Sequence, residues 1–234
     1  MQRPIIEIED LYKIYNPGEN EVHALDGVSL TVYEGEFVAI VGHSGSGKST
    51  LMNMIGCLDV PTSGSYRLNG QDVSTMTDNE LSTIRNREIG FVFQSFNLIQ
   101  NLSAFENVEL PLIYRGIPAA KRQQLAIAAL QKVGLEGRMD HRPNQMSGGQ
   151  QQRVAVARAL AASPPLILAD EPTGNLDTKA GAQVFEIIRQ LNAEGNTIVL
   201  ITHDDELALK AQRMVRITDG KIDNGDAPEG KEIF

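Results

Sequence analysis

The sequence is poor in cysteine and has no long apolar run, and both absences limit what the chain can be. Cys57 is the single cysteine among 234 residues, so no internal disulfide can form, which fits a reducing compartment. The longest apolar stretches, residues 37–41 and 197–202, have the length of strands and fall far short of the ~20 apolar residues that span a bilayer. Residues 1–4 lack the apolar core of a signal peptide. The sequence therefore predicts a globular protein without a membrane span of its own.

Basic residues are also scarce. The chain carries 21 lysines and arginines against 30 aspartates and glutamates, which gives a formal net charge of -9. A nucleic-acid binder needs a basic surface for its phosphate contacts, so we expect no nucleic-acid partner. At 41% hydrophobic and 22% charged residues, the composition is ordinary for a globular protein, and the length allows one large domain or two small ones.

The most informative stretch lies between residues 37 and 58. Five apolar residues, 37–41, predict a buried strand, and apolar residues at helical spacing follow from Leu51. Between them lies a match to Gly-x-x-x-x-Gly-Lys-Ser/Thr, and strand, glycine loop and helix are the context that this pattern requires. A glycine-rich turn between a core strand and a core helix is the alternative. The predicted phosphate-binding loop consists of Gly42, His43, Ser44, Gly45, Ser46, Gly47, Lys48, Ser49 and Thr50.

The loop pattern carries a physical mechanism. Its glycines let successive backbone N–H groups point at an anion, and the helix that begins near Lys48 adds its positive end. Lys48 is expected to reach the β- and γ-phosphates of a nucleotide, and the Ser49 hydroxyl to bind Mg²⁺. His43 occupies a variable position of the loop, so we assign it no chemistry of its own.

A second acidic site follows another apolar strand, residues 166–169. Asp170 is expected to hold Mg²⁺ beside Ser49. Glu171, the next residue, can polarise an attacking water as a general base. A pair of carboxylates that merely caps the loop after a core strand is the alternative, and the presence of the phosphate loop favours the functional interpretation.

Residues 146–153, Met-Ser-Gly-Gly-Gln-Gln-Gln-Arg, resemble the signature motif of ABC-type ATPases, usually Leu-Ser-Gly-Gly-Gln. Met at position 146 is a mild apolar replacement. Ser147 can cap a helix that begins there, and the two glycines expose its first N–H groups, which makes a second anion site. The resemblance implies ATP and Mg²⁺ as cofactors and a homodimer that forms on ATP binding. Each chain then addresses the γ-phosphate of its partner's ATP through Ser147, Gly148, Gly149 and Gln150.

The other motifs of that family are present in order. Gln94 matches the glutamine that senses Mg²⁺ and the attacking water, and is therefore both a nucleotide and a metal residue. His203, at the end of an apolar strand, matches the switch histidine that contacts the γ-phosphate. Asp177 matches the loop that communicates between the two sites. Residues 174–175 are Gly-Asn instead of the usual Ser-Ala, so this match depends on Asp177. The resemblance thus implies Glu171, His203, Lys48 and Gln94 as the catalytic residues.

An aromatic side chain is expected to stack on adenine. Tyr15 is placed in this role by the resemblance, and Tyr12 competes with it. A tyrosine that simply packs at a strand end is the alternative for either residue.

The resemblance covers about residues 5–222 and implies an α/β fold. We expect a P-loop NTPase core with a mostly parallel sheet, an N-terminal antiparallel β layer and a helical insert. The Asp26-Gly27 pair predicts a hairpin between strands at 22–25 and 28–32. The chain from Asp219, rich in Gly, Asp, Glu and Lys, is expected to be mobile. The predicted domains are a core of residues 1–94 and 166–222, a helical signature subdomain of residues 95–165, and a mobile tail of residues 223–234. Helices are expected near 106–112, 119–133 and 150–162 in the subdomain, and at 205–211 in the core.

Within the family, the chain resembles the branch of macrolide exporters, lipoprotein-release ATPases and cell-division relatives. This implies an integral-membrane permease as partner and a peripheral location at the cytoplasmic face of the inner membrane. The docking surface is expected within residues 94–106, whose apolar members are Phe96, Leu98, Ile99, Leu102 and Phe105. The alternative for any one of them is a core residue of the helical insert.

Two other classes remain as alternatives. A P-loop kinase or GTPase does not need Ser-Gly-Gly-Gln, and the guanine-specific Asn-Lys-x-Asp is absent. A soluble ABC ATPase of DNA repair or translation usually has a long coiled-coil insertion or tandem domains, and the chain has neither.

Overall fold

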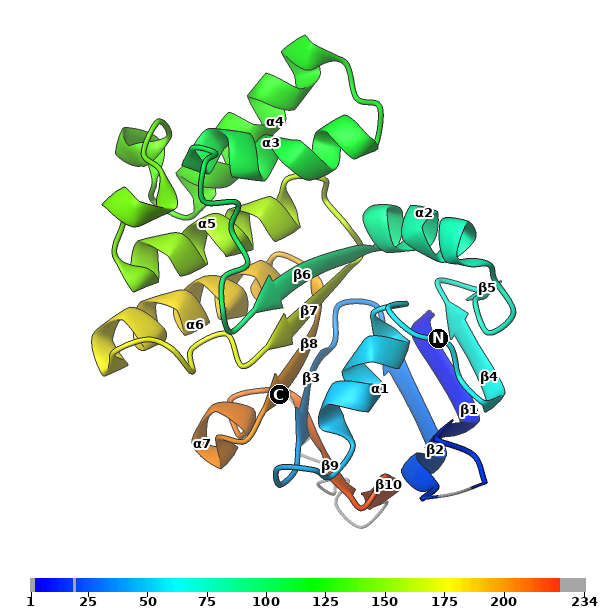
Figure 1. The fold of residues 1–234 in the computed structure, drawn as a ribbon. Coiled ribbons are helices and arrows are strands. Elements are labelled where there is room, and N and C mark those ends of the chain that lie inside the picture. Colours follow the sequence, from blue (N-terminus) through cyan, green and yellow to red (C-terminus); the bar gives the residue numbers. More distant parts are fainter. Residues whose placement is uncertain (1–2, 19, 224–234) are drawn as a thin grey trace. The chain divides into compact units, whose positions relative to one another are not determined.

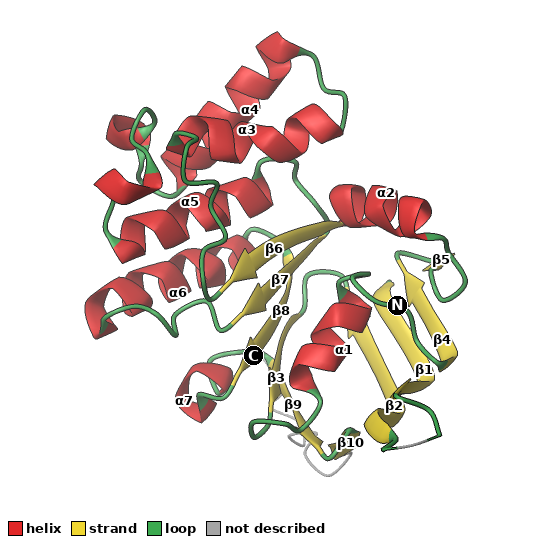
Figure 2. Cartoon of the chain, viewed as in Figure 1, coloured by secondary structure: helices red, strands yellow, loops and turns green. Residues whose placement is uncertain are grey.

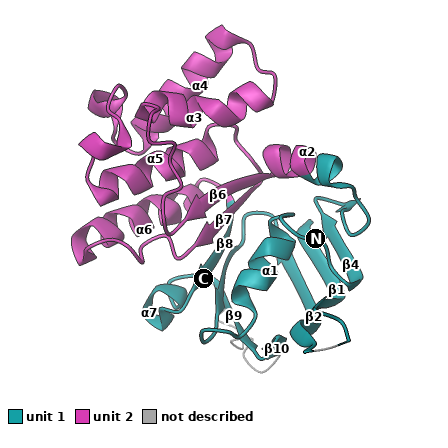
Figure 3. Ribbon diagram, viewed as in Figure 1, with its two compact units in different colours: residues 1–81, 197–234 teal, residues 82–196 magenta. Residues whose placement is uncertain are grey.

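The computed structural model describes residues 3–18 and 20–223, and its elements are shown in Figures 1 and 2. The chain divides into two compact units, residues 1–81 with 197–234, and residues 82–196 (Figure 3). Among the described residues, no helix is both long and apolar enough to cross a membrane. The predicted mobile tail, residues 223–234, lies outside the described residues except for Asp223.

The first unit contains a four-stranded antiparallel sheet in the order β2-β1-β4-β5. Alternate residues of β1, such as Ile6 and Ile8, are buried, as expected for a sheet with one face on the core. Ile8 pairs with Leu30 on one side and with Tyr66 on the other. The strands are β1 (Pro4–Tyr15), β2 (Val22–Tyr33), β4 (Ser63–Leu68) and β5 (Gln71–Asp72).

The predicted hairpin at Asp26-Gly27 is wrong, because β2 runs through these residues without a break. Its two halves do not pair with each other; both pair with β1, since Val28 lies opposite Leu11 and Leu25 opposite Lys13. A register shift between these two pairs and the left-handed φ of 73° at Gly27 show that the Asp-Gly pair makes a bulge in a long strand.

The same unit contains a second set of strands centred on β3 (Phe37–Val41), which is buried along its whole length. It pairs in parallel with β8 (Thr197–Thr202) and β9 (Arg213–Thr218), and neighbours on both edges explain the continuous apolar run. The helices of this unit are α1 (Lys48–Ile55) and α7 (Asp205–Ala208).

Two boundaries in this region differ from the prediction. The helix α7 ends at Ala208, not at residue 211. The first residues of the stretch expected to be mobile from Asp219 are instead ordered, because a turn with positive φ at Asp219 and Gly220 leads into β10 (Lys221–Asp223). This strand pairs antiparallel with β9.

The second unit combines a parallel pair of strands with a group of helices. The strands are β6 (Ile89–Phe93) and β7 (Leu166–Asp170). Gly90 allows α5 to pack closely on β6, because a Cβ atom there would overlap the carbonyl oxygen of Ala159. The helices are α2 (Asp78–Glu88), whose last seven residues lie in this unit, α3 (Ala104–Tyr114), α4 (Ala119–Lys132), α5 (Gly148–Leu160) and α6 (Thr178–Ala193).

Candidate active site

The loop between β3 and α1 requires glycine at defined positions. Gly45 and Gly47 have φ angles of 81° and 105°, in the left-handed region that side chains disfavour. A Cβ atom at Gly47 would lie 2.5 Å from the carbonyl oxygen of Ala24, and one at Gly42 would overlap the carbonyl oxygen of Ile217. The loop is therefore shaped by close backbone neighbours, and substitution of these glycines would disturb it.

Backbone hydrogen bonds fix the back of this loop. The Gly220 N–H donates to the carbonyl of Ser46 at 2.9 Å, and the Asp26 N–H donates to the carbonyl of Gly220 at 2.9 Å. An ion pair of 3.1 Å between Lys221 and Asp26 accompanies these bonds. The loop is thus anchored to β2 and to the turn before β10. The Ser46 hydroxyl is buried there and has no partner among the described atoms.

The first turn of α1 is open to an anion. Gly47 is its N-cap, and no side chain caps it, so the first N–H groups of the helix are not used by a capping oxygen. Lys48 Nζ donates to the carbonyls of Gly42 at 2.6 Å and His43 at 2.8 Å, which holds the ammonium group over its own loop. Exposed N–H groups beside a cation are the features that bind phosphate.

Tyr15 lies at the end of β1, where 37% of it is exposed. Its hydroxyl donates to Asp59 Oδ2 at 3.1 Å, and Lys13 Nζ lies 5.0 Å from its ring centre. Partial burial and the hydrogen bond to Asp59 raise the pKa of Tyr15. Tyr12 instead has its hydroxyl 3.0 Å from the position of a Cβ atom at Gly27. Tyr15 is therefore the more accessible of the two aromatic candidates.

His203 directly follows β8 and is exposed. The next residue, Asp204, caps α7 by accepting hydrogen bonds from the N–H groups of Glu206 and Leu207. The predicted position of His203 at the end of a strand is confirmed, and the cap fixes the turn from which its side chain projects.

In the second unit, Gln94 follows β6, while Asp170 is the last residue of the neighbouring parallel strand β7 and Glu171 follows it. Phe93 pairs with Asp170 at the carboxyl ends of β6 and β7, so Gln94 and Glu171 leave the same edge of this strand pair. Glu171 has a φ angle of 44°, which is uncommon for a residue with a side chain. Backbone strain of this kind is found often at active sites.

A buried glutamine that the sequence interpretation missed connects these two strands. Gln152 is completely buried on α5, and its Nε2 donates to the carbonyls of Phe93 at 3.1 Å and Pro172 at 2.7 Å. Its spacing from Ala155 and Val156, which are buried on the same helix, was a signal that its side chain faces the core. Gln152 holds together the backbone segments that precede Gln94 and follow Glu171.

The signature residues form a capping box at the start of α5. The Gln150 N–H donates to Ser147 Oγ at 3.3 Å, and the Ser147 N–H donates to Gln150 Oε1 at 2.9 Å, so the predicted cap is confirmed. Ser147 is exposed, and Gly148, Gly149 and Gln150 are half-buried. This helix start therefore lies on the surface of its own unit.

Asp177 caps the neighbouring helix α6 by accepting a hydrogen bond of 2.9 Å from the Ala180 N–H. Gly149 approaches the same turn, because a Cβ atom there would lie 2.9 Å from Ala180 Cβ. The first turns of α5 and α6 are thus packed against each other at Ala180.

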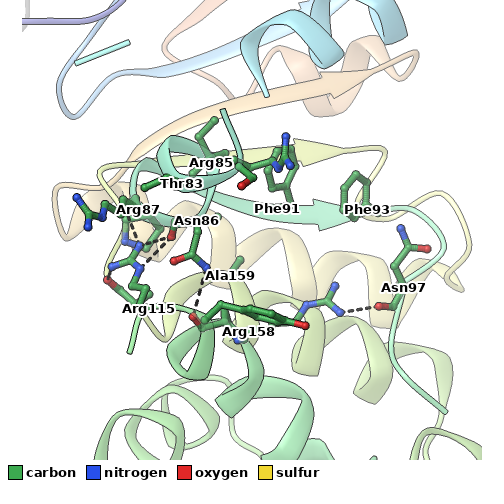
Figure 4. Close-up of a pocket in the computed structure, with 17 residues that line it drawn as sticks. Thr83, Arg85, Asn86, Arg87, Phe91, Phe93, Asn97, Arg115, Arg158 and Ala159 are labelled. Carbon is green, nitrogen blue, oxygen red and sulfur yellow. Dashed lines mark hydrogen bonds between the residues drawn. The ribbon is translucent and has the colours of Figure 1, made fainter. Parts of the chain in front are cut away.

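The second unit also contains a cavity of about 710 Å³ between α2, β6, α3 and α5 (Figure 4). Its lining includes the exposed Tyr114 and four arginines, and it includes no carboxylate. Arg158 donates to the carbonyls of Phe96 at 3.0 Å and Asn97 at 2.5 Å, and burial lowers the pKa of this arginine. The arginines are Arg85, Arg87, Arg115 and Arg158.

Of the apolar residues expected to form a docking surface, the structure exposes only some. Leu98 is buried, so it does not belong to a docking surface, and the alternative of a core residue holds for it. The buried Asn107 explains why, because its Oδ1 accepts from the Ile99 N–H and its Nδ2 donates to the carbonyls of Leu102 and Ser103. The loop is folded around this amide with Leu98 inward, while Ile99 is 41% exposed.

Comparison with known proteins identifies the family of the chain. Residues 25–174 match the family described as ABC transporter. An uncharacterized ABC transporter ATP-binding protein of Thermotoga maritima is 55% identical over 94% of this chain and 94% of its own length. The macrolide export ATP-binding/permease protein MacB of Hyphomonas neptunium is 51% identical over 99% of this chain. The chain spans only 36% of that longer protein.

Solved structures give the same result for the fold. The dimeric post-hydrolysis state of the ATP-binding cassette MJ0796 bound to ADP and Pi is matched with a TM-score of 0.85 and 46% identity. The match covers 93% of this chain and 96% of that chain. The predicted fold class is therefore confirmed, and the chain belongs to the ABC transporter family as an ATP-binding cassette.

Proposed function

We propose that two copies of this chain close on ATP, hydrolyse it and thereby drive a membrane permease of the macrolide-export or lipoprotein-release type. The observation that carries the proposal is the presence of two different glycine-containing helix starts, each of which suits an anion. One follows the phosphate loop, and the other is the Ser147-Gly148-Gly149-Gln150 box, which is exposed at Ser147. A single nucleotide in its own subunit needs only the first, so the second is available to the nucleotide of a partner.

The side chains present fit ATP with Mg²⁺. Mg²⁺ prefers oxygen ligands, and the chain offers the exposed Ser49 hydroxyl, the Asp170 carboxylate and the Gln94 carboxamide. When bound, the metal supplies charge that neutralises the phosphates. Lys48 and the loop N–H groups hold the phosphate chain, and Tyr15 offers its ring to the adenine.

The chemistry that these residues support is direct attack of water on the γ-phosphate, without a covalent intermediate. Glu171 accepts the proton of the water as general base. His203 holds the γ-phosphate, and Asp177 links the site to the partner subunit. We expect the chain to release inorganic phosphate from ATP, and EDTA to stop this release. Failure to bind or hydrolyse ATP at any Mg²⁺ concentration would contradict the proposal.

The membrane partner is proposed to dock on the arginine-lined cavity and the adjoining Ile99. Four arginines line this cavity, and they suit a segment that carries acidic residues, because opposite charges steer and orient a partner. The subunit would then work at the cytoplasmic face of the membrane, and the permease would select the substrate. Tyr114 is 77% exposed, so Tyr114→Asp should reduce co-purification with the permease while ATP binding persists.

The alternative function is that of a soluble ABC ATPase without a transport role. Retention of the chain on DNA or on ribosomes, instead of co-purification with a membrane protein, would support this alternative. The net charge of -9 does not favour it, because phosphate contacts need basic surfaces.

A further inference from the structure

The residues after β6 and after β7 are joined by a reciprocal pair of amide hydrogen bonds. Asn175 Nδ2 donates to the backbone carbonyl of Gln94 at 3.0 Å, and Gln94 Nε2 donates to Asn175 Oδ1 at 3.4 Å. The two residues are 81 positions apart in sequence. Asn175 is one of the two residues at which the chain departs from the usual Ser-Ala of this loop.

The pair fixes which way the Gln94 amide points. A backbone carbonyl can only accept, so the group of Asn175 that faces it must be its NH₂. Asn175 Oδ1 then faces the Gln94 side chain. Because this oxygen can only accept a hydrogen bond, its partner must be the NH₂ group of Gln94. Because Nε2 of Gln94 is used in this way, Oε1 is the atom that remains as an acceptor for a cation.

The other departure, Gly174, makes room for this arrangement. A Cβ atom at Gly174 would lie 2.6 Å from Gln94 Nε2, closer than side-chain atoms pack. A serine, which is usual here, would displace the amide of Gln94. Gly174 and Asn175 therefore act together, since one leaves the space and the other supplies the hydrogen bonds.

A buried side chain, Gln152, holds the backbone segments on which Gln94 and Asn175 lie. Gln152 binds the carbonyls of Phe93, just before Gln94, and of Pro172, two residues before Gly174. Both backbones are thus held at a fixed distance by a side chain that solvent does not reach. The exposed amide pair needs to orient only one side chain, not two loops.

We propose that Asn175, with Gly174, is a positioning residue that turns the Gln94 carboxamide so that its oxygen is offered to the nucleotide-bound metal. The inference rests on the proposed function, because it takes Gln94 as a metal residue. It adds a specific reason for the Gly-Asn sequence and predicts that this chain binds the metal more tightly than a variant with the usual residues.

The test measures metal binding without hydrolysis. Mn²⁺ is titrated into the full chain with a non-hydrolysable ATP analogue, and free Mn²⁺ is followed by electron paramagnetic resonance. Asn175→Ala removes both hydrogen bonds of the pair, including the one that orients the Gln94 carboxamide, and should weaken Mn²⁺ binding roughly three- to tenfold. Gly174→Ala should give a similar loss by displacing Nε2. Affinity for the analogue without metal should not change.

Two controls and a double variant make the result specific. Asn144 is exposed, and a Cβ atom at Gly137 meets nothing within 4 Å, so Asn144→Ala and Gly137→Ala should bind Mn²⁺ as the wild type does. In a Gln94→Ala background, Asn175→Ala should have no further effect, because it acts only through Gln94.

Unchanged Mn²⁺ affinity in both Asn175→Ala and Gly174→Ala would overturn the inference and leave the proposed function intact. An additive loss in the double variant would also overturn it. If the wild-type chain adds nothing to the Mn²⁺ affinity of the free analogue, the proposed function itself fails, and this inference fails with it.

Discussion

The two helices α1 and α5 begin in opposite ways, although both are proposed to bind phosphate. The helix α1 starts at Gly47, which has a left-handed backbone and no side-chain cap. The helix α5 starts at Ser147 in a complete capping box with Gln150. One start leaves its donors open, while the other satisfies part of them within its own chain.

The difference corresponds to what each start has to do. The loop before α1 is anchored from behind by Gly220 and Asp26, so it keeps its shape without a cap. The start of α5 is exposed at Ser147, and the side chains of Ser147 and Gln150 stabilise it through the capping box. The first helix start therefore suits the proposed role of binding the phosphates of the chain's own nucleotide, and the second suits the proposed role of binding the nucleotide of a partner subunit.

The largest effect is expected on the rate of hydrolysis, from a substitution that removes the proposed base and leaves the nucleotide-binding residues in place. Glu171→Gln keeps the shape of the side chain but removes the base, so hydrolysis should fall by roughly 10² to 10⁴. Nucleotide affinity should be retained, since both helix starts are intact. Phosphate release and binding of a fluorescent ATP analogue measure the two quantities. Hydrolysis at the original rate would show that another group is the base.

The next largest effect should come from the open helix start. Lys48→Ala removes a cation from the phosphate loop, and charge-assisted hydrogen bonds of this kind contribute about 1.5–3 kcal/mol. ATP affinity should therefore fall by roughly 10- to 100-fold, which equilibrium titration can measure. An unchanged affinity would remove Lys48 from the nucleotide site.

Replacing a glycine by alanine at each helix start should lower the free energy of unfolding by different amounts. Gly47→Ala forces a side chain into a left-handed conformation and against the carbonyl of Ala24, and should cost about 1–3 kcal/mol. A Cβ atom at Gly148 meets only ordinary contacts of 3.5 and 3.6 Å, so Gly148→Ala should stay within about 0.5 kcal/mol of the wild type. Urea unfolding measures both, and equal effects would contradict the comparison.

The smallest effect is expected from the cap of α5. Ser147→Ala removes the oxygen that accepts from the Gln150 N–H, which typically costs about 1 kcal/mol. For a chain of this size the Tm should fall by about 2–4 °C. Ser147→Asp retains a capping acceptor and should restore most of the Tm. No change in Tm for Ser147→Ala would mean that the capping box contributes nothing to stability.

Local patterns were sufficient to predict much of the fold and of the site. The buried strand before Gly42, the helix after it and the cap at Ser147 depend on residues adjacent in sequence, so the pattern alone identified them. The hairpin predicted from the Asp26-Gly27 pair is wrong, because β1 is long enough to pair with both halves of β2, and this pairing overrides the local preference of Asp-Gly for a tight turn.

Interactions between distant residues could not be predicted in this way. The bond between Asn175 and Gln94 and the bridge made by Gln152 depend on which strands are neighbours, and a single sequence does not give that pairing. Whether Leu98 faces the surface or the core could not be predicted for a similar reason, because the fold of its loop is set by Asn107, which lies on the following helix.

The sharpest test of the account is the association state of the Glu171→Gln chain in sedimentation velocity. ATP should convert it from monomer to dimer, because each exposed Ser147 start would engage the nucleotide of the other copy, and ADP should not. Adding Ser147→Arg should abolish the dimer while each monomer still binds ATP. A Glu171→Gln chain that stays monomeric at saturating ATP would contradict the central claim.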